Sequence, residues 1–216
     1  MRSWALDCCS AGPSTRKVSS TRSPSVLTLA SCRLTWLRAS TTLPAKTTLV
    51  SAQQAAAYYD ADKSKSAYAT VDAYLADLVD ILRGEIDELI RLGCQYIQID
   101  SPQYTALLDP DLRAGYRQRG NDPDRLLELA IEMDNAIIGQ HTGITFGLHL
   151  CRGNNQSKFY AAGDYGPITK VFRKTKFARF LLEFDDERSG GFEPLAEVPE
   201  DRIVVLGLVS TKKPEL

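Results

Sequence analysis

Residues 71–100 read VDAYLADLVDILRGEIDELIRLGCQYIQID and describe a helix that leads into a strand. The apolar side chains of the first two thirds recur every three or four positions, which is the period of a helix with one buried face. We expect this helix to begin near Ser66 and to end at Gly93, where a glycine commonly terminates a helix. Residues 96–99 then form a short strand that ends in Asp100.

The same order of strand and helix continues on both sides of this stretch. Alternating strands and helices predict an α/β protein with a parallel sheet, here of the (β/α)8 TIM-barrel type but with only five strands. The strands are apolar runs, so we expect both of their faces to be buried. The remaining strands are predicted at residues 46–50, 144–151, 178–184 and 203–209, and two further helices begin near 121–123 and span 167–174.

The composition of the chain is that of a globular protein able to bury a core. The 216 residues are 44% hydrophobic and 25% charged, with a net charge of −1. This balance offers no basic field for a nucleic-acid partner, and the apolar runs are shorter than the roughly 18 residues of a membrane span. Five cysteines are too few and too irregularly spaced for a disulfide framework, so we expect a soluble, cytoplasmic protein.

Residues 1–45 differ from the rest in composition. They contain six Lys or Arg side chains against the single acid Asp7, many Ser and Thr residues, and no steady apolar period. We interpret this segment as a disordered or non-homologous extension, with a mitochondrial transit peptide as the alternative that its Arg-rich, Ser-rich composition leaves open. We therefore predict two parts: residues 1–45 without stable tertiary contacts, and residues 46–216 as one partial barrel domain.

His149 and Cys151 are the first candidates for chemistry, because they end a predicted strand. Side chains at positions i and i+2 of a strand point to the same face, so the imidazole and the thiol project together. A nitrogen and a sulfur donor are ligands that zinc prefers. The alternative interpretation is a buried cysteine beside a hydrogen-bonded histidine.

Glu183 lies near the end of the next predicted strand, within an otherwise apolar run. A buried carboxylate needs a metal or an ionic partner, so it either joins His149 and Cys151 or pairs with Arg188 or Arg152. Asp100, at the end of an earlier strand, either caps a turn or binds a substrate ammonium group. The other candidates, Cys94 and His141, are better explained as a buried hydrophobic residue and as a surface or capping residue.

Taken together, three stretches resemble the C-terminal catalytic domain of cobalamin-independent methionine synthase. They are YIQIDSP (residues 96–102), HLCRGN (149–154) and LEFDDERSG (182–190), with a weaker match at VVLGLV (204–209). The resemblance covers the chain from about Lys46 onward. It implies a barrel in which a His-x-Cys pair, a Glu on the following strand and a later Cys bind zinc.

For this chain the resemblance implies zinc bound by His149, Cys151 and Glu183, with Asp100 and Ser51 as substrate-binding residues. The implied activity is methyl transfer from a methyltetrahydrofolate-type donor to a small thiol such as homocysteine, in methionine biosynthesis. The sequence departs from the family pattern where Ser101 replaces a Glu, and where residues 210–212 read Ser-Thr-Lys in place of Asp-x-His. The fourth zinc ligand and the first barrel strands find no counterpart.

Three functions therefore stay open from the sequence. The first is the zinc-dependent methyltransferase, and the second is a related zinc alkyltransferase that acts on another thiol, such as coenzyme M. The third is a catalytically inactive fragment of the family, for which we expect no detectable methionine formation by the 216-residue chain. Intact mass and metal content separate the third function from the other two.

Overall fold

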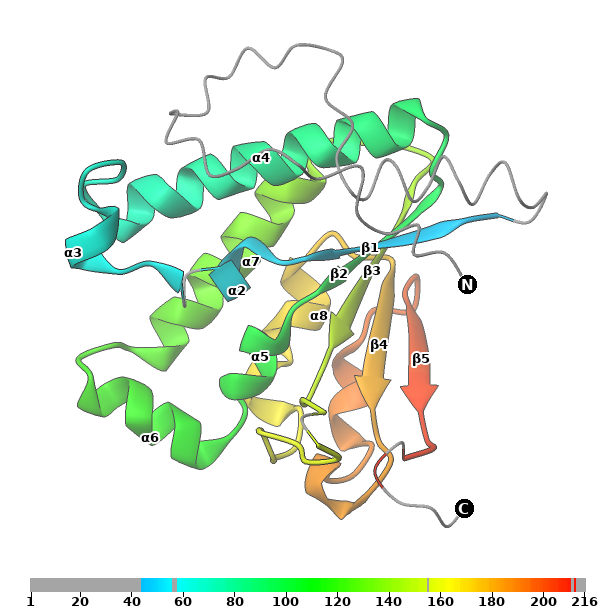
Figure 1. The fold of residues 1–216 in the computed structure, drawn as a ribbon. Helices are drawn as coiled ribbons and strands as arrows, with labels where there is room; N and C mark the ends of the chain where they lie inside the picture. The colour runs from blue at the N-terminus through cyan, green and yellow to red at the C-terminus, as the bar shows by residue number, and fades with distance from the viewer. Residues whose placement is uncertain (1–43, 56–57, 155, 211, 213–216) are drawn as a thin grey trace, which may run out of the picture.

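The structure, a computed structural model, describes residues 44–216 apart from 56–57, 155, 211 and 213–216. Five strands form one parallel sheet, in which each strand pairs with the next along the chain. The sheet does not close, and the direction of its strands turns steadily from β1 to β5 (Figure 1). This confirms the α/β class and agrees with an incomplete barrel. The strands are β1 (Lys46–Val50), β2 (Tyr96–Asp100), β3 (Thr145–Leu150), β4 (Arg179–Glu183) and β5 (Ile203–Gly207).

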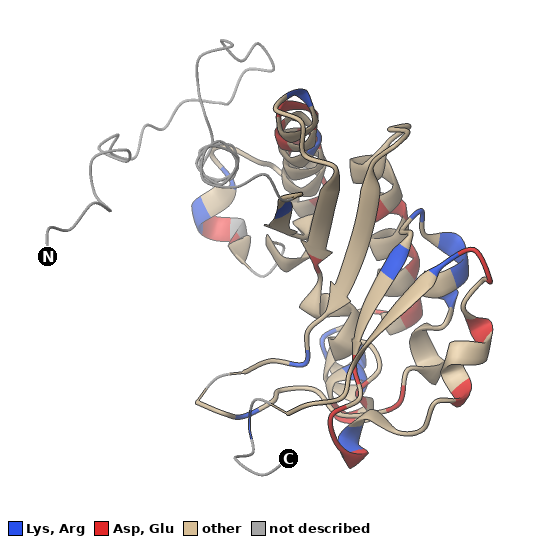
Figure 2. Ribbon diagram, turned by 90° about the vertical axis from the view of Figure 1, so that its right-hand side faces the viewer, with Lys and Arg blue, Asp and Glu red and all other residues tan. Residues whose placement is uncertain are grey.

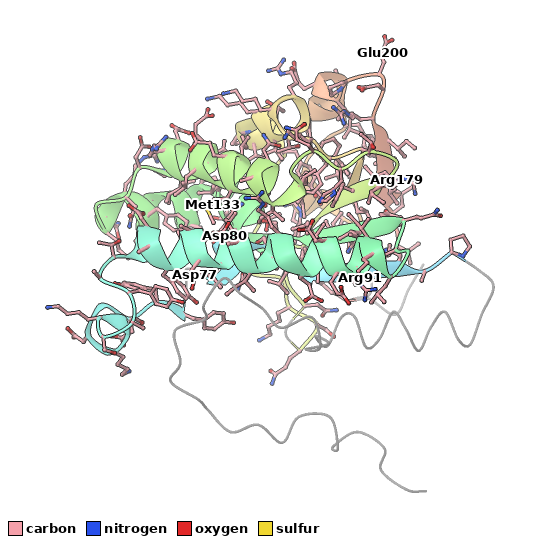
Figure 3. The ribbon with its side chains drawn as sticks, turned by 90° about the horizontal axis from the view of Figure 1, so that it is seen from above. Asp77, Asp80, Arg91, Met133, Arg179 and Glu200 are labelled. Carbon is pink, nitrogen blue, oxygen red and sulfur yellow. The ribbon has the colours of Figure 1, made fainter. Side chains whose placement is uncertain are left out.

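Two long helices make up most of the layer behind the sheet. α4 (Val71–Arg91) begins after Thr70, whose hydroxyl accepts a hydrogen bond from the N–H of Ala73, and α7 (Pro123–Ile138) begins after the similar cap Asp122. Viewed from above, α4 and α7 lie side by side, with Met133 of α7 at their junction (Figure 3). The shorter helices are α2 (Ala52–Ala55), α3 (Ala61–Ser64), α5 (Pro102–Ala106), α6 (Pro110–Gln118) and α8 (Lys170–Lys174), and the 3-10 helices are η2 (Gly166–Ile168), η3 (Glu187–Ser189) and η4 (Glu193–Glu197).

The core lies between the sheet and this helical layer. Alternate side chains of the central strands point into it and are almost fully buried, because helices cover that face. Burying a side chain of this size contributes about 1.5–3 kcal/mol each. The buried strand residues are Ile97, Ile99, Phe146, Leu148, Leu150, Phe180 and Leu182.

The opposite face of the sheet is only partly covered, which corrects the expectation of strands buried on both faces. β1 and β4 alternate between buried and more exposed residues, and every residue of β5 is at least partly exposed. Among the described residues, that second face carries no helical layer, and side chains such as Tyr96 lie across it. The ring of Tyr96 packs against Gly147, with Arg179 on one side.

The predicted strands and the two main helices are confirmed, with small shifts at their ends. α4 begins at Val71 instead of near Ser66, because Thr70 supplies the cap. Gly93 has a φ of 85°, a backbone conformation that favours glycine. Four short helices, α2, α3, α5 and α6, were not predicted, since helices of four to nine residues carry little periodic signal.

The prediction for residues 1–45 falls almost entirely outside the described part of the chain. Ala45 is described and packs against the core next to β1. Over the described range, no helix has both the length and the apolar content that crossing a membrane requires.

Candidate functional site at the carboxyl end of the sheet

His149 lies between two carboxylates that come from the neighbouring strands. Asp100 of β2 and His149 of β3 are paired in the sheet register and therefore share one face. The Nδ1 atom of His149 lies 2.7 Å from Oδ1 of Asp100, and its Nε2 atom lies 3.7 Å from Oε1 of Glu183. The carboxyl ends of three adjacent strands, called the rim below, thus place Asp100, His149 and Glu183 next to one another.

The two carboxylates change the protonation of the imidazole. Burial alone would lower the pKa of His149, but the contacts with Asp100 and Glu183 outweigh it and raise this pKa to about 9. Burial acts in the opposite direction on Glu183, and the contacts with His149 and with the backbone of Arg152 outweigh it and lower the pKa of Glu183. With this pKa, the His149 imidazole is protonated at neutral pH.

Glu183 is fixed by its surroundings on both its main chain and its side chain. The hydroxyl of Tyr165 accepts a hydrogen bond from the Glu183 N–H at 2.9 Å, and donates one to the Glu183 carbonyl at 3.3 Å. One carboxylate oxygen accepts from the N–H of Arg152 at 3.3 Å, and the other accepts from Arg188 at 3.1 Å. The sequence left two interpretations of Glu183 open, a place beside His149 or an ion pair with an arginine. In the structure Glu183 contacts His149 and also pairs with Arg188.

The side chain of Arg152 supports the site from within the protein interior. Its side chain is fully buried, donates to the carbonyl of Gly163 at 2.8 Å and stacks on the ring of Tyr165, 4.5 Å from its centre. The same tyrosine holds the main chain of Glu183. Arg152 thus braces the end of β4 and does not reach the open rim.

Cys151 follows the last residue of β3 and is half-buried as a free thiol. Its sulfur accepts a hydrogen bond from the N–H of Gly153 at 3.3 Å, and its carbonyl accepts one from Thr105 at 2.6 Å. Burial raises the pKa of the Cys151 thiol, and the negative charges of Asp100 and Glu183 raise it further. The thiol is therefore protonated at neutral pH unless a cation lies next to it.

The donor types at this rim fit a zinc ion, although the described part of the chain gathers no three His, Cys, Asp or Glu side chains closely enough to hold one. The Nε2 atom of His149 faces Glu183, while Asp100 occupies Nδ1, as an acid commonly does for a metal-bound histidine. Cys151 supplies a sulfur donor two residues beyond His149. Zinc binding by these residues stays a prediction.

The predicted substrate-binding residues lie at the same end of the sheet. Ser51 directly follows β1, and its N–H donates to the carbonyl of Asp100 at 3.0 Å. The hydroxyls of Ser51 and Ser101 are buried and find no hydrogen-bond partner within the described residues. Asp100 neither caps a turn nor stands alone, because it pairs with His149, a contact that the register of two strands far apart in sequence produces.

Loops beyond the strand ends complete the site with residues that the sequence did not single out for this role. Basic and acidic segments lie next to one another on these loops (Figure 2). Tyr160 folds back over the rim, where its hydroxyl lies 3.0 Å from that of Thr105 and also contacts the carbonyl of Pro102. Gly153, with a φ of 87°, allows this approach, since a β-carbon there would lie 2.6 Å from the Tyr160 ring.

The two remaining candidates lie away from the rim. Cys94 is buried just before β2, at the opposite end of that strand. His141 is exposed before β3, where it contacts Asp87 of α4 at 3.1 Å. Both placements agree with the structural roles expected from the sequence.

Comparisons with solved structures find methionine synthase-like proteins that share this fold. A structure from Listeria monocytogenes, assigned as a vitamin-B12-independent methionine synthase, matches 82% of this chain and 49% of its own, with 26% identity and a TM-score of 0.59. A B12-independent methionine synthase from Shewanella sp. W3-18-1, solved in complex with selenomethionine, matches 81% and 47%, with 18% identity and a TM-score of 0.62. The second likeness supports the fold alone.

Sequence comparison finds two proteins of Bacillus subtilis (strain 168) that have no assigned function. YxjH is 29% identical over 162 residues, which are 74% of this chain and 43% of YxjH. YxjG is 38% identical over 127 residues, which are 57% of this chain and 34% of YxjG. The chain thus spans less than half the length of these relatives. No protein-family model matches it.

Proposed function

We propose that this chain carries the zinc-binding part of a methyltransferase that transfers a methyl group to a small thiol such as homocysteine, in methionine biosynthesis. The observation that carries the proposal is the alignment of Asp100, His149 and Glu183 across three adjacent strand ends, with Cys151 directly after the middle strand. The likeness to the Listeria monocytogenes structure, which is named as a B12-independent methionine synthase, supports the same reaction class. A methyltetrahydrofolate-type molecule is the proposed donor.

Each residue has a distinct proposed role. His149 binds the ion through Nε2 while Asp100 holds Nδ1, Cys151 supplies the thiolate, and Glu183 supplies one oxygen. When bound, zinc lowers the pKa of a substrate thiol and holds it as a thiolate at neutral pH. The side chain of Asp100 is about one-third exposed, so its second oxygen can accept from a substrate ammonium group, next to Ser51.

Loading the site requires the loss of two protons. His149 is charged and Cys151 is a neutral thiol in the metal-free protein at neutral pH. Both must be deprotonated before they can act as ligands, so metal binding releases protons and strengthens as the pH rises. Zinc affinity is therefore expected to increase between pH 6 and pH 9.

The test is the zinc content of purified protein by mass spectrometry. Wild type should hold one zinc per chain, while Cys151→Ser and His149→Ala should lose it, and Glu183→Gln should lose less because an amide oxygen can still approach the ion. The matched controls are Cys94→Ser and His141→Ala, the other described cysteine and histidine. Equal zinc in wild type and Cys151→Ser would overturn the site.

The substrate class is tested on the cobalt-substituted protein. Homocysteine should bind through its sulfur and change the visible spectrum, and Asp100→Asn should weaken this binding more than it weakens cobalt binding. An equal response to coenzyme M would assign a different thiol, and no response to either thiol would contradict the proposed reaction. Methionine formation from a methyltetrahydrofolate donor then tests the transfer step.

A further inference from the structure

We propose that Arg188 is a positioning residue that turns the Glu183 carboxylate so that one chosen oxygen faces His149. This inference rests on the proposed function, since it concerns how Glu183 is presented to a metal ion. Arg188 lies in η3, in the loop that follows β4, only five residues beyond Glu183. Its contact with that carboxylate is therefore made within one strand-loop unit.

Arg188 contacts one carboxylate oxygen of Glu183, and the other oxygen faces His149. The Nη2 atom of Arg188 donates to Oε2 at 3.1 Å. Oε1 is left to accept from the N–H of Arg152 at 3.3 Å and to face Nε2 of His149 at 3.7 Å. With Oε2 occupied, Glu183 can offer a metal ion one oxygen only, which suits a four-coordinate site.

Arg188 is itself held firmly, which a positioning role requires. Its side chain is 5% exposed, and it donates to Oδ1 of Asp185 at 2.7 Å and lies 2.5 Å from Oδ1 of Asp186. Its guanidinium also lies over the ring of Phe159, 4.9 Å from the centre. A planar guanidinium can contact several acids in fixed directions at once, whereas a lysine ammonium behaves as a single point charge.

A purely structural role would be to tie the loop after β4 to the strand end. The two roles differ in what they change: loop anchoring affects stability, whereas positioning affects how the folded protein binds a metal. The informative variants are Arg188→Met, which keeps the apolar stem, and Arg188→Lys, which keeps the charge. Arg173→Met is the matched control, because Arg173 pairs with Glu197 away from the rim.

The experiment is a cobalt(II) titration of metal-free protein, followed by its visible spectrum. Arg188→Met should bind cobalt about 10–100-fold more weakly than wild type, as other residues that hold a metal ligand do when removed. Its bound spectrum should lose the intensity of four-coordinate cobalt, because the released carboxylate can bind through both oxygens. Arg188→Lys should recover part of the affinity, and Arg173→Met should match wild type. A Kd and spectrum for Arg188→Met equal to those of wild type would overturn the proposal.

A crystal structure of metal-free Arg188→Met separates this inference from the proposed function. Glu183 is expected to rotate away from His149 in that structure, and an unchanged carboxylate would contradict the positioning role. A wild-type protein that binds no metal would instead overturn the proposed function, and the crystal structure would still decide the role of Arg188.

Discussion

β3 and β5 are both short parallel strands, yet their surroundings differ sharply. β3 reads TFGLHL, includes a glycine and a histidine, and buries four of its six residues. β5 reads IVVLG and is the more apolar of the two, yet none of its residues is buried. The more hydrophobic strand is thus the more exposed one.

The difference follows from what surrounds each strand. β3 pairs with β2 on one side and β4 on the other, and its core-facing residues pack under the helical layer. β5 pairs with β4 alone among the described residues, and Leu206 on its core-facing side remains 40% exposed. Local composition therefore specifies that a segment forms a strand, while neighbouring elements decide whether that strand is buried.

The largest expected effect compares one leucine from each strand. Leu148→Ala in β3 should reduce the free energy of unfolding by about 2–5 kcal/mol, because Leu148 is fully buried and leaves a cavity. Leu206→Ala in β5 should cost under about 1 kcal/mol, since part of that side chain already contacts solvent. Denaturant unfolding of both variants measures the difference. Equal losses would show that β5 is covered in solution.

The second prediction tests a polar group on the covered side of the sheet. Asp134 of α7 is buried, and burial raises its pKa to about 7, although a hydrogen bond from Tyr104 acts against this rise. The neutral carboxyl is therefore favoured in the folded state, and wild type should lose stability as the pH rises from about 4 to about 7. Asp134→Asn should be more stable than wild type by about 2–4 kcal/mol at pH 8 and similar to it at pH 4. A variant with the same pH dependence as wild type would contradict this account.

A third prediction concerns the end of β3, where His149 lies beside two acids, whereas β5 ends at Gly207. The pKa of His149 is raised to about 9, so its stabilising contacts are fully present below about pH 6.5 and are lost as the pH rises through about 9. Asp100→Asn should lower this pKa by about 1–2 units, because one of the two carboxylates is removed. Histidine NMR titration of the metal-free protein measures the change. An unchanged pKa would show that Asp100 does not pair with His149 in solution.

The smallest expected effect concerns the exposed face of β5. Val205→Thr replaces one β-branched residue with another at a position that is 42% exposed, so the free energy of unfolding should change by less than about 0.5 kcal/mol. Gel filtration at several protein concentrations provides the second measurement. A large loss of stability, or a change in apparent mass, would mean that this face packs against other polypeptide.

The sequence alone determined the strand and helix order from Lys46 onward. Apolar period, the glycine after α4 and the proline at the start of α7 are local signals, and they predicted all five strands and both long helices. The sequence did not predict the short helices α2, α3, α5 and α6, or the exposure of β5. Those features depend on contacts between residues far apart in the chain, and local composition does not record such contacts.

The same division holds for the candidate site. The His149-Leu150-Cys151 spacing and the isolated Glu183 identified its main members, since a strand's two-residue period places alternate side chains on one face. Only the tertiary structure set Asp100 beside His149, because that contact depends on the register between β2 and β3. Likewise, only the fold of the loop after β4 shows that Arg188, and not Arg152, is the ionic partner of Glu183. A sequence shows which charged residues are present. Which of them form pairs depends on distances of a few ångströms, and the packing of the sheet and its loops sets these distances.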